Sequence, residues 1–260
     1  MQPNHMIREV LKNLNEGTIS LEEAVREIEG LRIDTVGEIA RLDTGRSVRC
    51  GIPEVILAEG KEPDHLVKIA KKQVESRGRC IISRLLPEHA GAVRSLCELN
   101  NIRAEFHEAA NMLVLAREGE CGPAKTGGVV GIVTAGTSDI GVAEEARVIA
   151  EEMGCTVLTA YDVGAAGIHR LFPAVRDLID AHVFVVAAGR EGTLPAVVAG
   201  LVNKPVIGVP VSSGYGYMGQ GRAALASMLQ SCSVIAVVNI DAGFTAGAFA
   251  ARIANMVAGP

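Results

Sequence analysis

The sequence predicts an α/β protein in which a smaller N-terminal domain precedes a doubly wound parallel sheet. The chain has 260 residues and is 48% hydrophobic, which is enough to bury a sizeable core. From residue 128 onward, near-continuous apolar segments alternate with amphipathic ones, as expected for parallel strands covered by helices on both faces. A charged, then Gly/Pro/Lys-rich segment at 118–128 separates the two halves. We therefore assign 1–125 to an N-terminal α/β domain and 126–260 to the C-terminal domain.

In the N-terminal domain, residues 5–31 are expected to form two amphipathic helices. Ser20 and Glu23 have the spacing of a capping box, so the second helix should begin at Leu21. Residues 32–50 are polar and are expected to be irregular. A small sheet is predicted over 53–118, with strands at 53–60, 79–86, 102–108 and 111–118 and helices at 63–77 and 87–101.

In the C-terminal domain, apolar and amphipathic segments alternate regularly to the end of the chain. The predicted strands are 128–136, 155–164, 181–189, 204–211 and 233–240. The predicted helices are 142–154, 168–180, 195–204, 219–231 and 242–259. This alternation specifies a parallel sheet with helices on both faces.

Composition excludes several classes of function. A net charge of −5 gives no electrostatic footprint for nucleic acid, and 3% aromatic residues with no Trp give few stacking surfaces. No apolar run is long enough for a transmembrane helix, and no signal peptide begins the chain, so we expect a cytoplasmic protein that binds neither membrane nor nucleic acid. The six cysteines lack metal-ligand spacing and are expected to be free thiols.

Ligands of an open parallel sheet bind at the carboxyl ends of its strands, so we searched the segments there. The first is Ala135–Gly141, in which Gly136 permits a tight turn. Thr137, Ser138 and the following helix N-terminus are suited to a phosphate. Asp139 is a candidate for binding a ribose hydroxyl or for proton transfer, with helix capping alone as the alternative. Neither a GxGxxG motif nor a P-loop is present.

Charged residues occupy the other carboxyl ends. His169 and Arg170 are candidates for an anionic substrate. Glu191 is a candidate general acid or base, and Arg190 a candidate carboxylate or phosphate ligand. Asp241, which follows the last strand, is suited to a ribose or a metal. For the His169–Arg170 and Arg190–Glu191 pairs the alternative is solvated surface charge.

Two further segments carry weaker signals. Ser212–Gly221 contains four glycines and two tyrosines and is expected to be a flexible loop that lies over a ligand. Cys232 lies just before the last predicted strand, at the opposite end from the other candidates. Its spacing alone predicts a small buried side chain, unless a subunit contact places it in a neighbour's site.

The segments GTSDIGVAEEA, GIHRL and GREGTLPAVVAGLVNKPVIGVPV resemble the aminoimidazole-ribonucleotide carboxylase (PurE) family over roughly residues 128–258. Two positions depart from that family's pattern. Thr193 stands where the motif histidine is expected, and Glu191 where small residues are expected. The first departure argues against the proton shuttle of that family, and the resemblance implies a PurE-like doubly wound fold that is typically octameric.

The full chain resembles the LarB family, the pyridinium-3,5-biscarboxylic acid mononucleotide synthases of nickel-pincer nucleotide biosynthesis. DTGRSVRCGIPEVILAEGK at 43–61 resembles its N-terminal signature, and MLQSC with VVNIDAGFTAG its C-terminal one. The resemblance implies a magnesium-assisted enzyme that carboxylates nicotinic acid adenine dinucleotide with CO2 and releases AMP. It also implies that Cys232 adds to the pyridinium ring and that Glu191 accepts the ring proton.

The dinucleotide's phosphates need cations, for which Arg46, Arg49 and Lys61 are candidates if the N-terminal domain closes over the site; a solvated face is the alternative. We expect a homo-oligomer, and specifically an octamer from the PurE-like domain. Two other functions remain open: a true aminoimidazole-ribonucleotide carboxylase and a non-catalytic nucleotide sensor. Thr193 and the long N-terminal domain argue against the first of these.

Overall fold

The structure, a computed structural model, describes residues 3–259, so positions 1, 2 and 260 of the two predicted domains lie outside it. The chain divides into two compact units. One comprises Met1–Phe106 and Leu113–Glu120, and the other comprises His107–Met112 and Cys121–Pro260. The chain passes for the last time between them after residue 120, inside the segment 118–128 that the sequence marks as a linker. No helix within the described residues is long and apolar enough to cross a bilayer.

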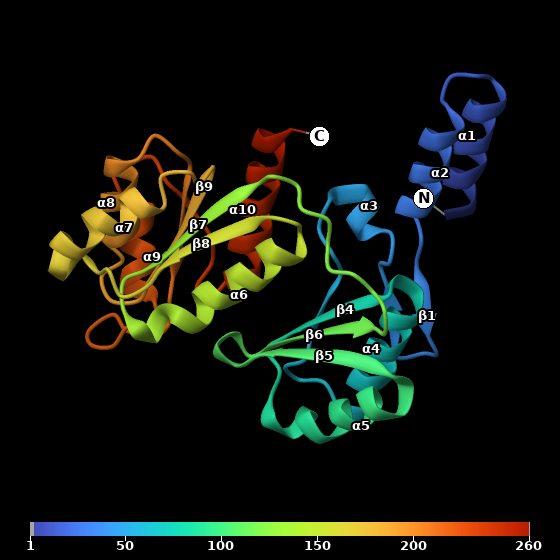
Figure 1. Cartoon of the computed structure of the whole chain (residues 1–260), viewed down its shortest axis with the longest axis horizontal. Helices are drawn as coiled ribbons and strands as arrows, with labels where there is room; N and C mark the ends of the chain where they lie inside the picture. Colours follow the sequence, from blue (N-terminus) through green and yellow to red (C-terminus); the bar gives the residue numbers. More distant parts are fainter. Residues whose placement is uncertain (1–2, 260) are drawn as a thin grey trace. The chain divides into compact units, whose positions relative to one another are not determined.

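The first unit begins with two helices, α1 (Pro3–Asn15) and α2 (Leu21–Gly30), as predicted (Figure 1). The Ser20 hydroxyl accepts from the Glu23 N–H at 3.1 Å, and the Glu23 carboxylate accepts from the Ser20 N–H at 2.7 Å. This reciprocal pair is the capping box that fixes the start of α2.

Residues 32–50 are more regular than predicted. Strands β1 (Asp34–Val36) and β2 (Ala40–Leu42) pair antiparallel, and α3 (Arg46–Cys50) follows them. Gly37 lies in the turn between the strands with φ +50°, a conformation that costs glycine little. Elements of three to five residues are too short to produce a hydrophobic period, which is why the sequence indicates only polar, irregular chain.

A four-stranded sheet completes the first unit, in the order β3-β4-β6-β5. Its strands are β3 (Val55–Leu57), β4 (Arg79–Ser83), β5 (Ile102–His107) and β6 (Met112–Arg117). Helix α4 (Pro63–Arg77) and the pair η1 (Pro87–His89) and α5 (Ala90–Asn100) connect them, and η2 (Glu108–Ala110) lies between β5 and β6. Side chains of α4 and α5 pack with the sheet into one core that includes Leu66, Ile69, Ile82, Val93 and Leu96.

The second unit is built on a five-stranded parallel sheet, as predicted. Its strands are β7 (Val129–Thr134), β8 (Thr156–Ala160), β9 (Val183–Ala188), β10 (Val206–Pro210) and β11 (Ala236–Val237). Its helical segments are η3 (Thr137–Asp139), α6 (Ile140–Glu152), η4 (Ala165–Arg170), α7 (Leu171–Asp177), α8 (Leu194–Leu201), α9 (Arg222–Leu229) and α10 (Gly243–Ala258).

Helices cover both faces of this sheet. Helices α6 and α10 pack together on one face (Figure 1). On the other face, side chains of α7, α8 and α9 share a core with alternate residues of the central strand β9: Leu171, Val175, Leu194, Val198, Ala224, Met228, Phe184, Val186 and Ala188. All six residues of β9 are buried, which explains why its sequence is apolar throughout rather than alternating.

The order of the strands, β11-β10-β9-β7-β8, fixes the position of a binding crevice. The chain runs from β7 outward to β8 and then returns to place β9 on the other side of β7. Loops after β7 and β9 therefore leave the sheet in opposite directions, and ligands of such sheets bind in the crevice between them. Asp139 lies after β7, and Arg190 and Glu191 lie after β9.

Candidate active site

Asp139 is a buried carboxylate at the crevice between the loops after β7 and β9, with 3% of its surface exposed. It is the last residue of η3, just after β7. Its Oδ2 accepts from the Gly136 N–H at 2.9 Å, and its Oδ1 accepts from the Ser213 hydroxyl at 2.8 Å. Burial raises the pKa of Asp139, while hydrogen bonds from Ser213 and from the Gly136 and Gly189 N–H groups oppose that rise.

Helix capping describes only one of the bonds of Asp139, whose carboxylate accepts from the N–H of Gly136, the N-cap residue of η3. Asp139 occupies the N-cap position of α6, but its side chain makes no capping hydrogen bond to that helix. It instead accepts from the loop before it and from the loops after β9 and β10. Thr137 and Ser138, the predicted phosphate-binding residues, are exposed beside it. The segment thus presents hydroxyl groups to solvent and keeps its carboxylate inside.

Glycine is required where the β9 loop passes Asp139. A Cβ atom on Gly189 would lie 2.2 Å from the Ser213 hydroxyl and 2.8 Å from Asp139 Oδ1. A Cβ atom on Gly214 would lie 2.0 Å from the Gly189 carbonyl oxygen. All three distances are below van der Waals contact, so the loops after β9 and β10 approach this closely only because Gly189 and Gly214 have no side chain.

Arg190 and Glu191 follow Gly189 and are both exposed. The Arg190 guanidinium stacks over the ring of Tyr215, which belongs to the Gly-rich loop after β10. Glu191 carries its carboxylate into solvent at the carboxyl end of the sheet. Thr193, two residues on, occupies the N-cap position of α8 without a side-chain capping bond.

The loop after β8 holds His169 and Arg170 at its far end, both exposed. Asp162, near its start, has φ +57°, and its N–H donates to the buried Thr134 hydroxyl at 3.0 Å. Arg170 donates to the Asp162 carboxylate at 2.9 Å. The cation predicted to meet the substrate is therefore tied to the base of its own loop.

Asp241 stabilises the start of the Gly-rich loop. Its Oδ1 accepts from the Ser212 N–H at 2.8 Å, and its own N–H donates to the Pro210 carbonyl at 2.9 Å. Asp241 adopts φ +54°, a left-handed conformation that aspartate tolerates better than most residues. One carboxylate oxygen of Asp241 is thus hydrogen-bonded to the backbone of the loop that contacts Asp139 through Ser213.

Cys232 is exposed, so the prediction from spacing that it is buried is wrong. The segment between α9 and β11 is fixed by the Ser233 hydroxyl, which donates to the Ala196 carbonyl at 3.0 Å. The same segment is accessible to solvent, since Val234 is 95% exposed. Cys232 precedes β11 whereas Glu191 follows β9, so in a parallel sheet they lie at opposite strand ends. The fold of one chain does not bring them together.

Of the three candidate cations in the first unit, Arg46 and Arg49 form ion pairs within that unit, and Lys61 is bonded there through its backbone. Arg46 pairs with Glu54 at 3.2 Å. Arg49 pairs with Asp43, which raises the Arg49 pKa, and donates to the Gly30 carbonyl at 2.6 Å. The Lys61 carbonyl bonds the Nε2 of the buried His89 at 2.9 Å.

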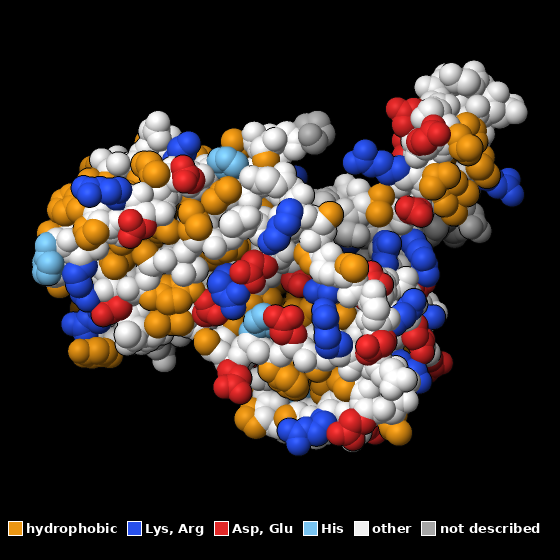
Figure 2. All heavy atoms as spheres, in the orientation of Figure 1, with side chains coloured by type: hydrophobic (Ala, Val, Ile, Leu, Met, Phe, Trp, Pro, Cys, Tyr) orange, Lys and Arg blue, Asp and Glu red, His pale blue; other side chains and the backbone are white. Residues whose placement is uncertain are grey.

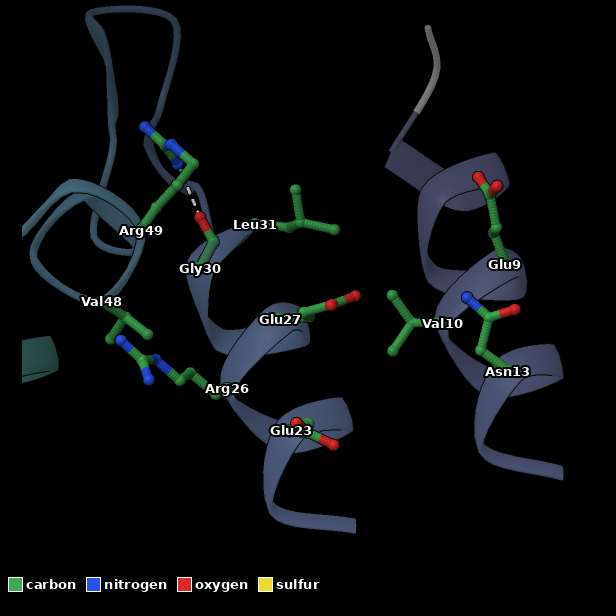
Figure 3. Close-up of a pocket in the computed structure, with 10 residues that line it drawn as sticks. All are labelled: Glu9, Val10, Asn13, Glu23, Arg26, Glu27, Gly30, Leu31, Val48 and Arg49. Carbon is green, nitrogen blue, oxygen red and sulfur yellow. Dashed lines mark hydrogen bonds between the residues drawn. The ribbon is translucent and has the colours of Figure 1, made fainter. Parts of the chain in front are cut away.

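Arg49 also lines a pocket of about 660 Å³ formed by α1, α2 and α3 (Figure 3). The lining includes Glu9, Glu23 and Glu27 as well as Arg26, so its charge is mixed. On the face drawn in Figure 2, positive and negative side chains are likewise interspersed. Neither surface offers the cluster of cations that a set of phosphates would favour.

A magnesium ion, which the family resemblance implies, finds no ready cage in the described part of the chain. Within residues 3–259, no group of three His, Cys, Asp or Glu side chains is placed to hold a metal ion. Magnesium commonly takes only one or two carboxylates together with substrate phosphates and water.

Comparison with known proteins identifies both halves of the chain. Residues 33–117 match the LarB/PurE-like N-terminal domain, and residues 129–258 match AIR carboxylase. An uncharacterized protein of Methanocaldococcus jannaschii is 42% identical over 256 residues, covering 96% of this chain and 98% of that protein. This chain belongs to the LarB family. The resemblance noted in its sequence is thereby confirmed, together with the PurE-like fold of its second unit.

Other relatives of this LarB-family protein match the second unit. The N5-carboxyaminoimidazole ribonucleotide mutase of M. jannaschii is 36% identical over 127 residues, or 47% of this chain and 76% of that protein. A probable N5-carboxyaminoimidazole ribonucleotide mutase of Methanobrevibacter smithii is 34% identical over 133 residues, or 48% of this chain and 37% of that protein. The second unit is thus of a carboxylase type, and each of these two matches covers less than half of this chain.

Two residues at the site were not singled out from the sequence: Ser213 and Tyr215. Both lie in the Gly-rich loop Ser212–Gly221, which the sequence marked as a loop over a ligand. The alternation of glycine with tyrosine and serine was the available signal, but it could not tell which side chain meets which partner.

Proposed function

We propose that this LarB-family protein carboxylates the pyridinium ring of nicotinic acid adenine dinucleotide and hydrolyses its phosphoanhydride. The products are pyridinium-3,5-biscarboxylic acid mononucleotide and AMP. CO2 is the co-substrate, and magnesium assists. The observation that carries this proposal is the exposure of Cys232, the cysteine that matches the family's C-terminal signature. An exposed thiol is able to reach a bound ring, whereas a thiol packed in the core is not.

The proposed chemistry begins from an electron-poor ring. The Cys232 thiolate adds to a ring carbon, forming a C–S bond and turning the pyridinium into a neutral dienamine. The dienamine carbon then attacks CO2, which forms the new C–C bond. Glu191 accepts the proton from that carbon, the C–S bond breaks, and the thiolate leaves as the ring regains its aromaticity. Covalent catalysis thus divides one difficult step into easier ones.

The same proposal requires a second copy of the chain. Cys232 and Glu191 lie at opposite strand ends of one sheet, so one active site needs Cys232 from one subunit and Glu191 from another. Exposed apolar side chains flank Cys232, since Leu229 is 66% and Val234 95% exposed. Apolar surface of this kind is suited to burial between subunits. We therefore propose a homo-oligomer, with an octamer as the expected order.

Other residues at the carboxyl ends have supporting roles in this proposal. The exposed hydroxyls of Thr137 and Ser138, together with the backbone at Gly136, are suited to a substrate phosphate. Arg170, His169 and Arg190 supply positive charge for carboxylate or phosphate groups, and Asp241 is suited to a ribose. Asp139 is suited to exchange protons, since burial raises its pKa toward neutrality. Arg46 and Arg49 would bind phosphate only by exchanging their present carboxylate partners.

Incubation of the purified protein with nicotinic acid adenine dinucleotide, bicarbonate and magnesium tests the proposal, with mass analysis of the products. We expect a mononucleotide that has gained one carboxyl group, together with AMP. Labelled bicarbonate should place its carbon in the new carboxyl group. If neither a carboxylated product nor AMP forms, the proposed activity is wrong.

The named mutase relatives favour one alternative, a reaction on an aminoimidazole ribonucleotide. Thr193 at the position of the motif histidine and the additional first unit argue against it. The same incubation with aminoimidazole ribonucleotide in place of the dinucleotide distinguishes the two. Turnover of the imidazole alone would establish the alternative.

A further inference from the structure

We infer that Ser213 is a positioning residue, which holds the Asp139 carboxylate in its working orientation. Its hydroxyl donates to Asp139 Oδ1 at 2.8 Å across 74 positions of sequence. Only the activity measurements below rest on the proposed function. The orientation and ionisation of Asp139 are properties of the free protein and can be measured without a substrate.

The first argument is geometric. Asp139 Oδ2 is oriented by its own loop, through the Gly136 N–H at 2.9 Å. Oδ1 is oriented by the Ser213 hydroxyl from the loop after β10, and the Gly189 N–H of the loop after β9 also donates to the carboxylate. Of these three donors Ser213 is the one supplied by a side chain, so it is the one that substitution can remove without disturbing the backbone.

The second argument is that glycine occupies the two positions at which a side chain would prevent this contact. A Cβ atom on Gly189 would lie 2.2 Å from the Ser213 hydroxyl, and one on Gly214 would lie 2.0 Å from the Gly189 carbonyl oxygen. Asp241 also holds the base of the same loop through the Ser212 N–H at 2.8 Å. A surface serine that made no such contact would require neither Gly189 and Gly214 nor the hydrogen bond from the Ser212 N–H to Asp241.

The third argument concerns charge. The hydrogen bond from Ser213 stabilises the ionised form of Asp139 and so opposes the rise in pKa that burial causes. Burial and the hydrogen bonds from Ser213, Gly136 and Gly189 together shift the pKa of Asp139. The charged groups on the surrounding loops are Asp162, His169, Arg170, Arg190, Glu191 and Asp241.

The test is Ser213→Ala, with Ser213→Thr to restore the hydroxyl and Ser212→Ala as the matched loss of a neighbouring hydroxyl. The pKa of Asp139 is read in the full-length protein by infrared spectroscopy on isotope-labelled aspartate, with Asp139→Asn used to assign the band. We expect Ser213→Ala to raise that pKa by roughly half a unit to one unit, as the loss of one hydrogen bond to the ionised form implies. Ser213→Thr should return it, and Ser212→Ala should not change it.

Activity is the second readout. In the pH profile of kcat/KM for the dinucleotide, the limb that belongs to Asp139 should move upward in Ser213→Ala and return in Ser213→Thr. A wild-type protein without activity would refute the proposed function but leave the infrared test intact. An unchanged Asp139 pKa in Ser213→Ala, or an activity loss that the threonine does not rescue and that leaves the profile in place, overturns the positioning role.

Discussion

The guanidinium carbon of Arg190 lies 4.0 Å from the centroid of the Tyr215 ring. This stacking joins the loop after β9 to the Gly-rich loop after β10. A cation placed over an aromatic face is restrained in direction while its edge remains available for hydrogen bonds. Tyr215 therefore restrains the guanidinium that we propose as a ligand for the substrate's anionic groups.

Tyr215→Leu should weaken substrate binding. An exposed cation–π contact contributes about 0.5–1 kcal/mol, so KM for the dinucleotide should rise roughly two- to fivefold with little change in kcat. Tyr215→Phe retains the ring and should stay near wild type. Tyr217→Leu, on the same loop with a fully exposed side chain, is the matched control. Equal effects of the Tyr215 and Tyr217 leucine variants would show that loop composition, and not the stacking, controls binding.

Cys232→Ala should abolish carboxylation while leaving the fold intact. The side chain is exposed, so its removal should change the free energy of unfolding by no more than about 0.5 kcal/mol. Loss of a nucleophile commonly reduces turnover by about 10³-fold or more. Cys121→Ala removes the other exposed thiol and should keep full activity. Substantial carboxylation by Cys232→Ala would exclude the covalent mechanism.

Gly189→Ala should impair the site more than the fold. The new methyl group would displace Ser213 and press on Asp139 Oδ1, so kcat/KM should fall by about tenfold or more, as is expected when a catalytic group is misplaced. Gly200→Ala in α8 is the matched control, since a Cβ there meets nothing within 4 Å. It should raise stability by about 0.5–1 kcal/mol through helix propensity. Thermal unfolding and steady-state kinetics on both variants separate the two effects.

Glu144→Gln should destabilise the protein in a pH-dependent way. Burial opposes ionisation of Glu144, but hydrogen bonds from Arg147 and Tyr161 outweigh it and lower the pKa. A lowered folded-state pKa adds stability above the ordinary glutamate value of about 4.3, and that stability is lost as pH falls through the folded value. The variant should therefore lose about 1–3 kcal/mol at pH 7 and approach wild type in acid.

Denaturant unfolding across the pH range checks the Glu144 prediction. Glu151→Gln is the comparison, because Glu151 contacts the same Arg147 at 2.7 Å but its side chain is 37% exposed. Its cost should stay below about 1 kcal/mol, as for exposed ion pairs. A deficit in Glu144→Gln that is constant with pH would mean that packing, and not charge, makes Glu144 important.

Helix boundaries were predictable where local chemistry sets them. Helix α4 spans Pro63–Arg77 as the sequence predicted, because Pro63 suits the first turn and Gly78, with φ +75°, ends the helix. The strand predicted at 233–240 shrinks to Ala236–Val237. Its apolar sequence matches that of the buried strands, but β11 is the edge of the sheet and pairs with β10 alone. Apolar sequence does not distinguish an edge from a centre.

At the site too, some residue positions follow from the sequence and others do not. The sequence could place Gly136, Asp139, Arg190 and Glu191 at the carboxyl ends of strands, because the apolar segments show where the strands end. The order of those strands, which brings the loops after β7 and β9 to one crevice, comes from the structure. The contact of Ser213 with Asp139 was not predictable, since it depends on the paths of two irregular loops. The spacing of Cys232 predicts a buried side chain, and this prediction is wrong, because Cys232 lies in an exposed segment in which Val234 is 95% exposed as well.

The three-loop contact at Asp139 also bears on how the protein forms. Asp139 is synthesised 74 positions before Ser213, so the hydrogen bond between them cannot form until β10 and the loop after it have been made. A chain that ends before Ser213 therefore lacks one of the donors that orient this carboxylate.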